Sequence, residues 1–196
     1  MNSDLQDEIK NFINHRVWMT KKSRMEAESR MNKNNVFSQF LVNYYTFIVL
    51  AFSILSLIEK NSDIIAIMTV IASVGLFGTT LFLTSMAYRE KAIQYKESYL
   101  SLNELESDLR HILRENNDDP EVITQFQKLE KKYNEILAKT DNHSEVDFNR
   151  VQLKHGAKLN KDNYLNYYRH KSITISFQII LILLPLALTI LYLRYK

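Results

Sequence analysis

The sequence predicts an all-α membrane protein: a transmembrane helical hairpin, a cytoplasmic helical, coiled-coil-like domain and a third, C-terminal transmembrane helix. Two observations lead to this fold class. First, the apolar residues of the 196-residue chain are concentrated in three blocks without charged side chains, each long enough to cross a hydrocarbon layer about 30 Å thick. Second, the whole chain has three glycines and two prolines, and so few turn-forming residues favour long helices over sheet.

The N-terminal segment, residues 1–35, is expected to be a cytoplasmic helical segment. Its first apolar residues recur at helical spacing between charged ones, which is typical of an amphipathic helix. Two interpretations of this apolar face are open: it lies along the membrane surface with Trp18 as an anchor, or it packs against the middle domain. The residues of the face are Leu5, Ile9, Phe12, Ile13 and Val17.

A transmembrane hairpin is predicted for residues 36–87. Its spans, residues 37–58 and 64–87, contain no charged residue, and the polar connection between them is so short that the spans must be antiparallel. A third transmembrane helix is predicted at residues 172–193. The basic residues of the tail, residues 194–196, follow it as a stop at the interface.

The distribution of lysine and arginine predicts the orientation, because these residues are enriched on the cytoplasmic side of a membrane. The tip of the hairpin has Lys60 alone, whereas the other segments that flank the spans are rich in basic residues. We therefore expect a cytoplasmic N-terminus and middle domain, with the tip and the C-terminal tail outside. The basic residues assigned to the cytoplasm are Lys21, Lys22, Arg24, Arg30, Lys33, Arg89, Lys91, Lys96, Arg169 and Lys171.

The middle domain, residues 88–171, shows apolar residues in alternating steps of four and three, the spacing of a coiled-coil seam. Glu106 interrupts this seam and Leu105 lies beside it, so a shift in register is expected there. A break at residues 116–120 precedes a second, similar pattern, and we expect the two helices to pack as a hairpin. The first seam, also a candidate for assembly between chains, consists of Tyr88, Ala92, Tyr95, Tyr99, Leu102, Leu109 and Leu113.

A shorter and less regular apolar segment, residues 146–153, follows the second helix and ends at Gly156. A last helix is expected to start near Asn160, which could cap it, and to continue into the third span.

The residue pattern argues against an enzyme. Cysteine is absent, and no two histidines lie three or four residues apart, as a metal site on a helix would require. The formal net charge is only +3, so a nucleic-acid partner is not expected either, and nothing implies a cofactor. The most polar local cluster, Asn142, His143 and Asp147, has two interpretations: a site for an ion or nucleotide, or residues that cap a helix.

The spans contain no Asp, Glu, Lys, Arg or His, which argues against ion-coupled transport. They do contain stripes of hydroxyl and amide side chains, which serve either close helix packing or, in an oligomer, the wall of a pore. Pro185 has no amide hydrogen to donate to the carbonyl of Leu181, which leaves that carbonyl open to a hydroxyl or to water. The candidate residues are Asn43, Thr46, Ser53, Ser56, Thr69, Ser73, Thr80, Thr84, Thr174, Gln178 and Thr189.

Three stretches in this order resemble a known family. They are RMEAESRMNKNN at Arg24 to Asn35, the tight two-span hairpin, and YREKAIQYKESYLSLNELESDL at Tyr88 to Leu109. The arrangement, over roughly residues 19–148, is similar to the SLATT proteins of bacteria, the two-span effectors associated with SMODS and SLOG domains. The stretch ILAKTDNHSEVDF, residues 136–148, also resembles the subgroup associated with reverse transcriptases.

The resemblance implies a membrane effector of antiphage defence in the bacterial inner membrane. It implies a homo-oligomer whose pore depolarises or permeabilises that membrane in abortive infection. It also implies a partner encoded nearby: a nucleotidyltransferase, a SLOG-domain protein or a reverse transcriptase. The residues alone leave an alternative, a membrane anchor that recruits a soluble enzyme. The third span is additional to the pair of spans that gives the family its name.

Overall fold

The structure, a computed structural model, describes residues 3–58, 63–115, 121–156 and 161–195, and every element in these ranges is a helix. The chain divides into two compact units. Unit 1 comprises Met1–Met31 and Arg89–Tyr167, and unit 2 comprises Asn32–Tyr88 and Tyr168–Lys196. Each unit is therefore assembled from segments that are far apart in the sequence.

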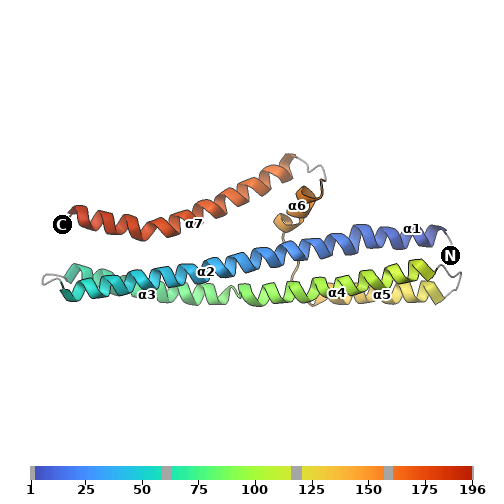
Figure 1. The fold of residues 1–196 in the computed structure, drawn as a ribbon, viewed down its shortest axis with the longest axis horizontal. Coiled ribbons are helices and arrows are strands. Elements are labelled where there is room, and N and C mark those ends of the chain that lie inside the picture. Colours follow the sequence, from blue (N-terminus) through green and yellow to red (C-terminus); the bar gives the residue numbers. More distant parts are fainter. Residues whose placement is uncertain (1–2, 59–62, 116–120, 157–160, 196) are drawn as a thin grey trace. The chain divides into compact units, whose positions relative to one another are not determined.

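The helices follow one another along the chain with few interruptions (Figure 1). Residues 59–62 of the expected hairpin tip at 59–63, the break at 116–120 and the cap at Asn160 lie outside the described residues. The elements are α1 (Ser3–Asn11), the π-helical η1 (Phe12–Val17), α2 (Trp18–Ile58), α3 (Asp63–Ser85), α4 (Tyr88–Glu115), α5 (Glu121–Ala138), α6 (Glu145–Lys154) and α7 (Lys161–Tyr195).

The core of unit 1 is formed by α1, η1, α4 and α5 together with the first turns of α2. The apolar face of the N-terminal segment is part of this core, because Ile9, Phe12, Ile13 and Val17 are all nearly or completely buried. The interpretation that this face lies on the membrane surface is therefore wrong, and the packing interpretation is confirmed. The other core residues are Leu102, Leu105, Leu109, Ile112, Val122, Phe126, Tyr133 and Ile136.

Helix α4 buries a face whose register differs from the expected seam. Leu105 is fully buried, whereas Tyr99 and Leu113 are only half-buried. Leu102 and Leu109 are also fully buried, but against α1, η1 and α5 of the same chain. These two leucines are therefore unavailable for contact between chains in this fold, since their apolar surface is already covered.

Two residues with positive φ lie where helices end. Gly156 follows α6 with a φ of 73°, the left-handed conformation that ends many helices and that glycine adopts without steric cost. Ala87 separates α3 from α4 with a φ of 49°. Because a side chain makes this conformation costly, the break at Ala87 must be held by the helices on both sides.

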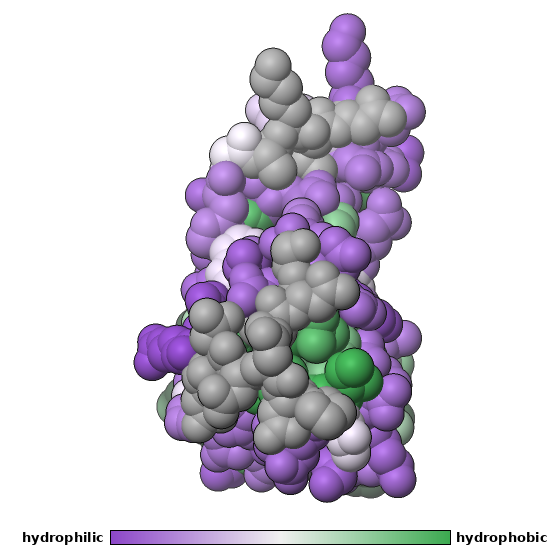
Figure 2. All heavy atoms as spheres, turned by 90° about the vertical axis from the view of Figure 1, so that its right-hand side faces the viewer, coloured by the Kyte–Doolittle hydropathy of each residue, from purple (hydrophilic) through white to green (hydrophobic). Residues whose placement is uncertain are grey.

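Unit 2 contains the membrane-spanning surface. Among the described residues, three helices are long and apolar enough to cross a membrane, and they correspond to the three expected spans. Their apolar side chains are largely uncovered: Phe47 is 72% exposed and Leu57 is 86% exposed. Such a surface is stable only in contact with lipid or another apolar partner. By contrast, the end of unit 1 that faces the viewer in Figure 2 is mostly hydrophilic around a small apolar area.

Candidate functional site

Two tyrosines of α2 bind the backbone of α7 inside unit 2. The hydroxyl of Tyr45 donates a hydrogen bond to the carbonyl oxygen of Leu181 at 2.8 Å, and the hydroxyl of Tyr44 donates to that of Ile182 at 3.0 Å. The Leu181 carbonyl is the one that Pro185 leaves without an amide donor. Of the two partners expected for this carbonyl, a hydroxyl or water, the structure shows a hydroxyl, and the donor is Tyr45, which the sequence pattern did not identify.

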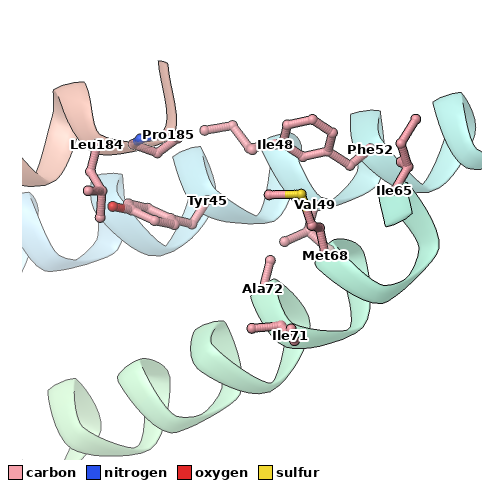
Figure 3. A pocket seen from close by; sticks show the side chains of 10 residues that line it. All are labelled: Tyr45, Ile48, Val49, Phe52, Ile65, Met68, Ile71, Ala72, Leu184 and Pro185. Atoms are coloured by element: carbon pink, nitrogen blue, oxygen red, sulfur yellow. The ribbon is translucent and has the colours of Figure 1, made fainter. Parts of the chain in front are cut away.

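An apolar cavity of about 260 Å³ lies beside this contact, with walls from α2, α3 and α7 (Figure 3). Among the described lining residues, Tyr45 alone has a hydroxyl, and that hydroxyl is already engaged with Leu181. The described lining residues therefore offer a ligand apolar contact and contribute no charge or metal ligand. The lining residues are Tyr45, Ile48, Val49, Phe52, Ile65, Met68, Ile71, Ala72, Leu184 and Pro185.

The hydroxyl groups of the candidate stripes bind their own helices. Thr46 donates to the carbonyl of Val42 at 2.7 Å, and the same bond to a residue three or four positions earlier recurs in all three spans. A hydroxyl satisfied in this way needs neither water nor a second helix. The residues concerned are Thr46, Ser53, Ser56, Thr69, Ser73, Thr80, Thr84, Thr174 and Thr189.

The two amides of the stripes differ from the hydroxyls. Within the described part of the chain, the side chains of Asn43 and Gln178 have no hydrogen-bond partner. Asn43 is exposed, and Gln178 is half-buried. Neither residue joins the tyrosine contact, so the candidate residues do not form one polar site in a single chain.

The polar cluster at the start of α6 serves the structure of unit 1. The carboxylate of Asp147 accepts hydrogen bonds from the backbone amide of Ser144 at 3.1 Å and from its hydroxyl at 2.7 Å, as at a capped helix start. Arg30 of α2 binds the same carboxylate through two nitrogens, at 2.8 and 2.9 Å. The carboxylate of Asp147 therefore fixes α6 to α2, in agreement with the capping interpretation.

The neighbours of Asp147 are not arranged as ligands. Asn142 accepts a hydrogen bond from the Tyr95 hydroxyl through its backbone carbonyl, and its side chain is exposed. Burial lowers the pKa of His143, despite the opposing charge of Asp147, so the imidazole is mainly neutral at pH 7. No group of three potential metal ligands occurs among the described residues.

A largely buried ion pair joins α2 to α4. Lys21 binds the carboxylate of Glu106 at 2.5 Å, and Arg110 binds it at 2.8 Å from one turn further along α4. Burial by itself raises the pKa of Glu106, but the hydrogen bonds from Lys21 and Arg110 outweigh it, and the pKa lies below its ordinary value. The residue that interrupts the expected apolar seam is thus charged and paired.

The class of this protein follows from the family whose sequence profile it matches. The sequence profile of SMODS and SLOG-associating 2TM effector domain family 5 (SLATT family 5) matches residues 6–192. The chain belongs to this family. The match extends through the third span of this SLATT chain, beyond the stretch in which the sequence motifs were found. No curated protein and no solved structure matches the chain.

Family membership and the fold agree on a membrane effector domain. The described residues of this SLATT chain form only helices, with three able to span a membrane, and they contain no sign of a catalytic fold. The composition of the spans predicted their polar residues but not the tyrosine contact, because a hydrogen bond between residues 136 positions apart leaves no local pattern.

Proposed function

We propose that this SLATT chain is an effector of bacterial antiphage defence that oligomerises and permeabilises or depolarises the inner membrane, which halts the infected cell. The observation that carries the proposal is the combination of membership of an effector family with three apolar helices, each long enough to span a membrane. Three helices cannot enclose a water-filled path, so a pore needs several copies of the chain.

In this proposal the N-terminus and unit 1 are cytoplasmic. The basic residues that flank the spans favour this orientation. Residues 37–58, 64–87 and 172–193 then cross the membrane, and residues 194–196 end outside. Unit 1 is the part that a cytoplasmic sensor can reach, and its partner is a nucleotidyltransferase, a SLOG-domain protein or a reverse transcriptase encoded nearby.

Membrane integrity during infection tests the proposal. The chain is expressed with its neighbouring genes, the cells are challenged with phage, and membrane potential and the entry of a membrane-impermeant dye are followed. We expect both the loss of potential and the growth arrest to require the chain. The control carries a stop codon in place of residue 37, before the first span. Growth arrest with an intact membrane potential and no dye entry would exclude the pore.

A second function, a membrane anchor that recruits a soluble enzyme, is favoured by one observation. The serine and threonine hydroxyls of the candidate stripes are satisfied within their own helices, as lipid-facing helices require. Replacement of residues 37–58, 64–87 and 172–193 by unrelated apolar spans of equal length separates the functions. Defence that survives this replacement identifies an anchor, and defence that disappears while unit 1 remains folded identifies a pore.

A further inference from the structure

Asn43 presents an amide to the hydrocarbon layer without a partner. Lys33 is the last charged residue before the first span, and Asn43 lies ten residues after it. Ten residues correspond to about 15 Å along the helix. The side chain is exposed, and no hydrogen bond to it is found among the described residues. In lipid an unsatisfied amide is costly, so a group from outside the chain must bind it.

The face of α2 that contains Asn43 points away from the other two spans of unit 2. Tyr45 binds α7, and a residue two positions earlier lies about 200° further round the helix. Val36, Leu50 and Leu57 share the face with Asn43 at intervals of seven residues, and they are 66%, 53% and 86% exposed. In a pair of parallel helices every seventh residue returns to the contact, so an apolar stripe with this interval and one amide fits such a pair.

We propose that this face of α2 binds the same face of a second copy of the chain, with the two Asn43 side chains hydrogen-bonded to each other. Every copy inserts in the same direction, so two α2 helices in contact run parallel and place identical residues at equal depth. An amide both donates and accepts, which makes Asn43 complementary to its own counterpart. The proposal deepens the proposed function, because it rests on oligomerisation and names the surface that mediates it.

The contact cannot be formed instead by the coiled-coil seam of α4, whose leucines are covered within the chain. The hydroxyl of Thr46, one turn from Asn43, already donates a hydrogen bond to the carbonyl of Val42, so it does not need a partner from a second chain. Asn43 is therefore the residue on this face whose polar group gains most from a second copy.

Disulfide cross-linking maps the contact directly, because the chain has no cysteine. Single cysteines are introduced as Leu50→Cys, on the proposed face, and as Ile48→Cys, at nearly the same depth but about 200° away on the side of the cavity. After oxidation in native membranes we expect a cross-linked dimer from Leu50→Cys and at least fivefold less from Ile48→Cys. Equal yields, or a higher yield at position 48, would overturn the proposed face.

Substitution of the amide measures its part in the contact. Asn43→Leu removes the hydrogen bond at similar side-chain size. We expect the association constant to fall roughly threefold to tenfold, the usual effect of one such bond between membrane helices. Asn43→Gln should retain most of the association, and Thr46→Val should leave it unchanged. Energy transfer between labelled copies in vesicles is the measurement. Parent-like association of Asn43→Leu would contradict the pairing.

The outcomes separate this inference from the proposed function. Chains that assemble and permeabilise membranes but cross-link at position 48 refute the α2 face and leave the pore standing. Chains that remain monomeric in membranes by both cross-linking and energy transfer refute the face and the oligomeric pore together. Chains that cross-link at position 50 and leave the membrane intact during growth arrest support the face and exclude the pore.

Discussion

At the scale of single residues, the contact between Tyr45 and Leu181 shows how a helix defect inside a membrane is repaired. A proline in a spanning helix frees one carbonyl, and water is not present in hydrocarbon to bind it. The Tyr45 hydroxyl takes the place of the missing amide donor at 2.8 Å. The bond therefore has two roles, because it satisfies α7 and also attaches the third span to the first.

Removal of this hydroxyl is predicted to loosen the third span. Tyr45→Phe should lower the stability of unit 2 by about 1 kcal/mol, the size of a hydrogen bond between membrane helices. Tyr44→Phe should have a smaller effect. The carbonyl of Ile182, which accepts the hydrogen bond from Tyr44, can also accept one from the backbone amide of Leu186. Equilibrium unfolding in mixed micelles is the measurement.

A double-mutant cycle tests whether the proline creates this dependence. Pro185→Ala restores an amide donor for the carbonyl of Leu181, so Tyr45→Phe should cost less in that background. An undiminished cost would show that the Tyr45 hydroxyl stabilises unit 2 in some other way.

The sequence predicted half of this contact. Pro185 identified the free carbonyl, since the chemistry of proline is local and independent of the fold. It did not identify Tyr45, because no local pattern shows which residue of the first span lies beside Leu181, 136 positions further along the chain. The same limit applies to Glu106: its position in the seam was visible, but its partner Lys21 lies 85 residues away.

Glu106 is predicted to make unit 1 sensitive to acid. Its pKa in the folded chain lies below the ordinary value of 4.5, so protons bind more readily to the unfolded chain. The stability that Glu106 contributes is therefore present at neutral pH and decreases as the pH falls below about 4.5. Glu106→Gln should cost about 2 kcal/mol at pH 7, because it leaves Lys21 nearly buried without a charged partner, and less in acid.

The measurement for Glu106 is thermal unfolding of the detergent-solubilised chain at pH 7 and at successively lower pH. Asp108→Asn is the control on the same helix, since Asp108 pairs with Lys132 at an exposed position and should contribute less than about 1 kcal/mol. If Glu106→Gln and the parent differed in stability by the same amount at every pH, the stability that Glu106 contributes would not depend on its protonation, and the prediction would be contradicted.

At the scale of elements, α6 is held in place by ionic contacts more than by apolar burial. Glu26 of α2 binds Arg150 at 3.0 Å and also Lys154, while Arg30 binds Asp147. Among the residues of α6, all of which the structure describes, Val151 is the one buried apolar side chain. Because α6 is short and buries little apolar surface, its separation from α2 should require less free energy than the separation of α4 or α5 from the core.

Asp147 is predicted to control the opening of α6. Asp147→Ala removes both the cap and the ion pair with Arg30 and should destabilise α6 by about 2–3 kcal/mol. Ser144→Ala removes a capping hydroxyl alone and should cost about 1 kcal/mol. Hydrogen exchange should accelerate in α6 for both variants, more for Asp147→Ala, with little change in α4. Exchange that accelerates equally in α4 and α6 would show that α6 does not open separately.

The seam of α4 shows what periodicity can and cannot predict about an element. The spacing predicted a helix with a buried stripe, and Leu102 and Leu109 are fully buried. It also predicted α5 as one partner, through the expected helical hairpin, but it left open whether a second chain covers the stripe as well, because a heptad pattern is the same for a helix of one chain and for a helix of another. The N-terminal segment, whose apolar face had two interpretations, turned out to be one of the partners.

At the scale of the whole molecule, each unit is discontinuous in sequence. Residues 1–31 of unit 1 are separated from residues 89–167 by the hairpin, yet both segments contribute to one core. The core of unit 1 consists of apolar side chains that are covered within the unit, and the end of the unit seen in Figure 2 is mostly hydrophilic around a small apolar area. These are the properties of a domain that does not need lipid to fold.

Unit 1 is therefore predicted to fold without the spans. Residues 1–31 joined by a flexible linker to residues 89–156 should give a soluble, helical protein, because Ile9, Ile13 and Val17 would still cover the leucines of α4. Circular dichroism and the cooperativity of thermal unfolding are the measurements. The matched control, residues 89–156 alone, exposes those leucines and should aggregate or unfold. Since the α2 face around Asn43 is absent from the linked protein, sedimentation should show a monomer; a stable oligomer would locate an assembly surface in unit 1.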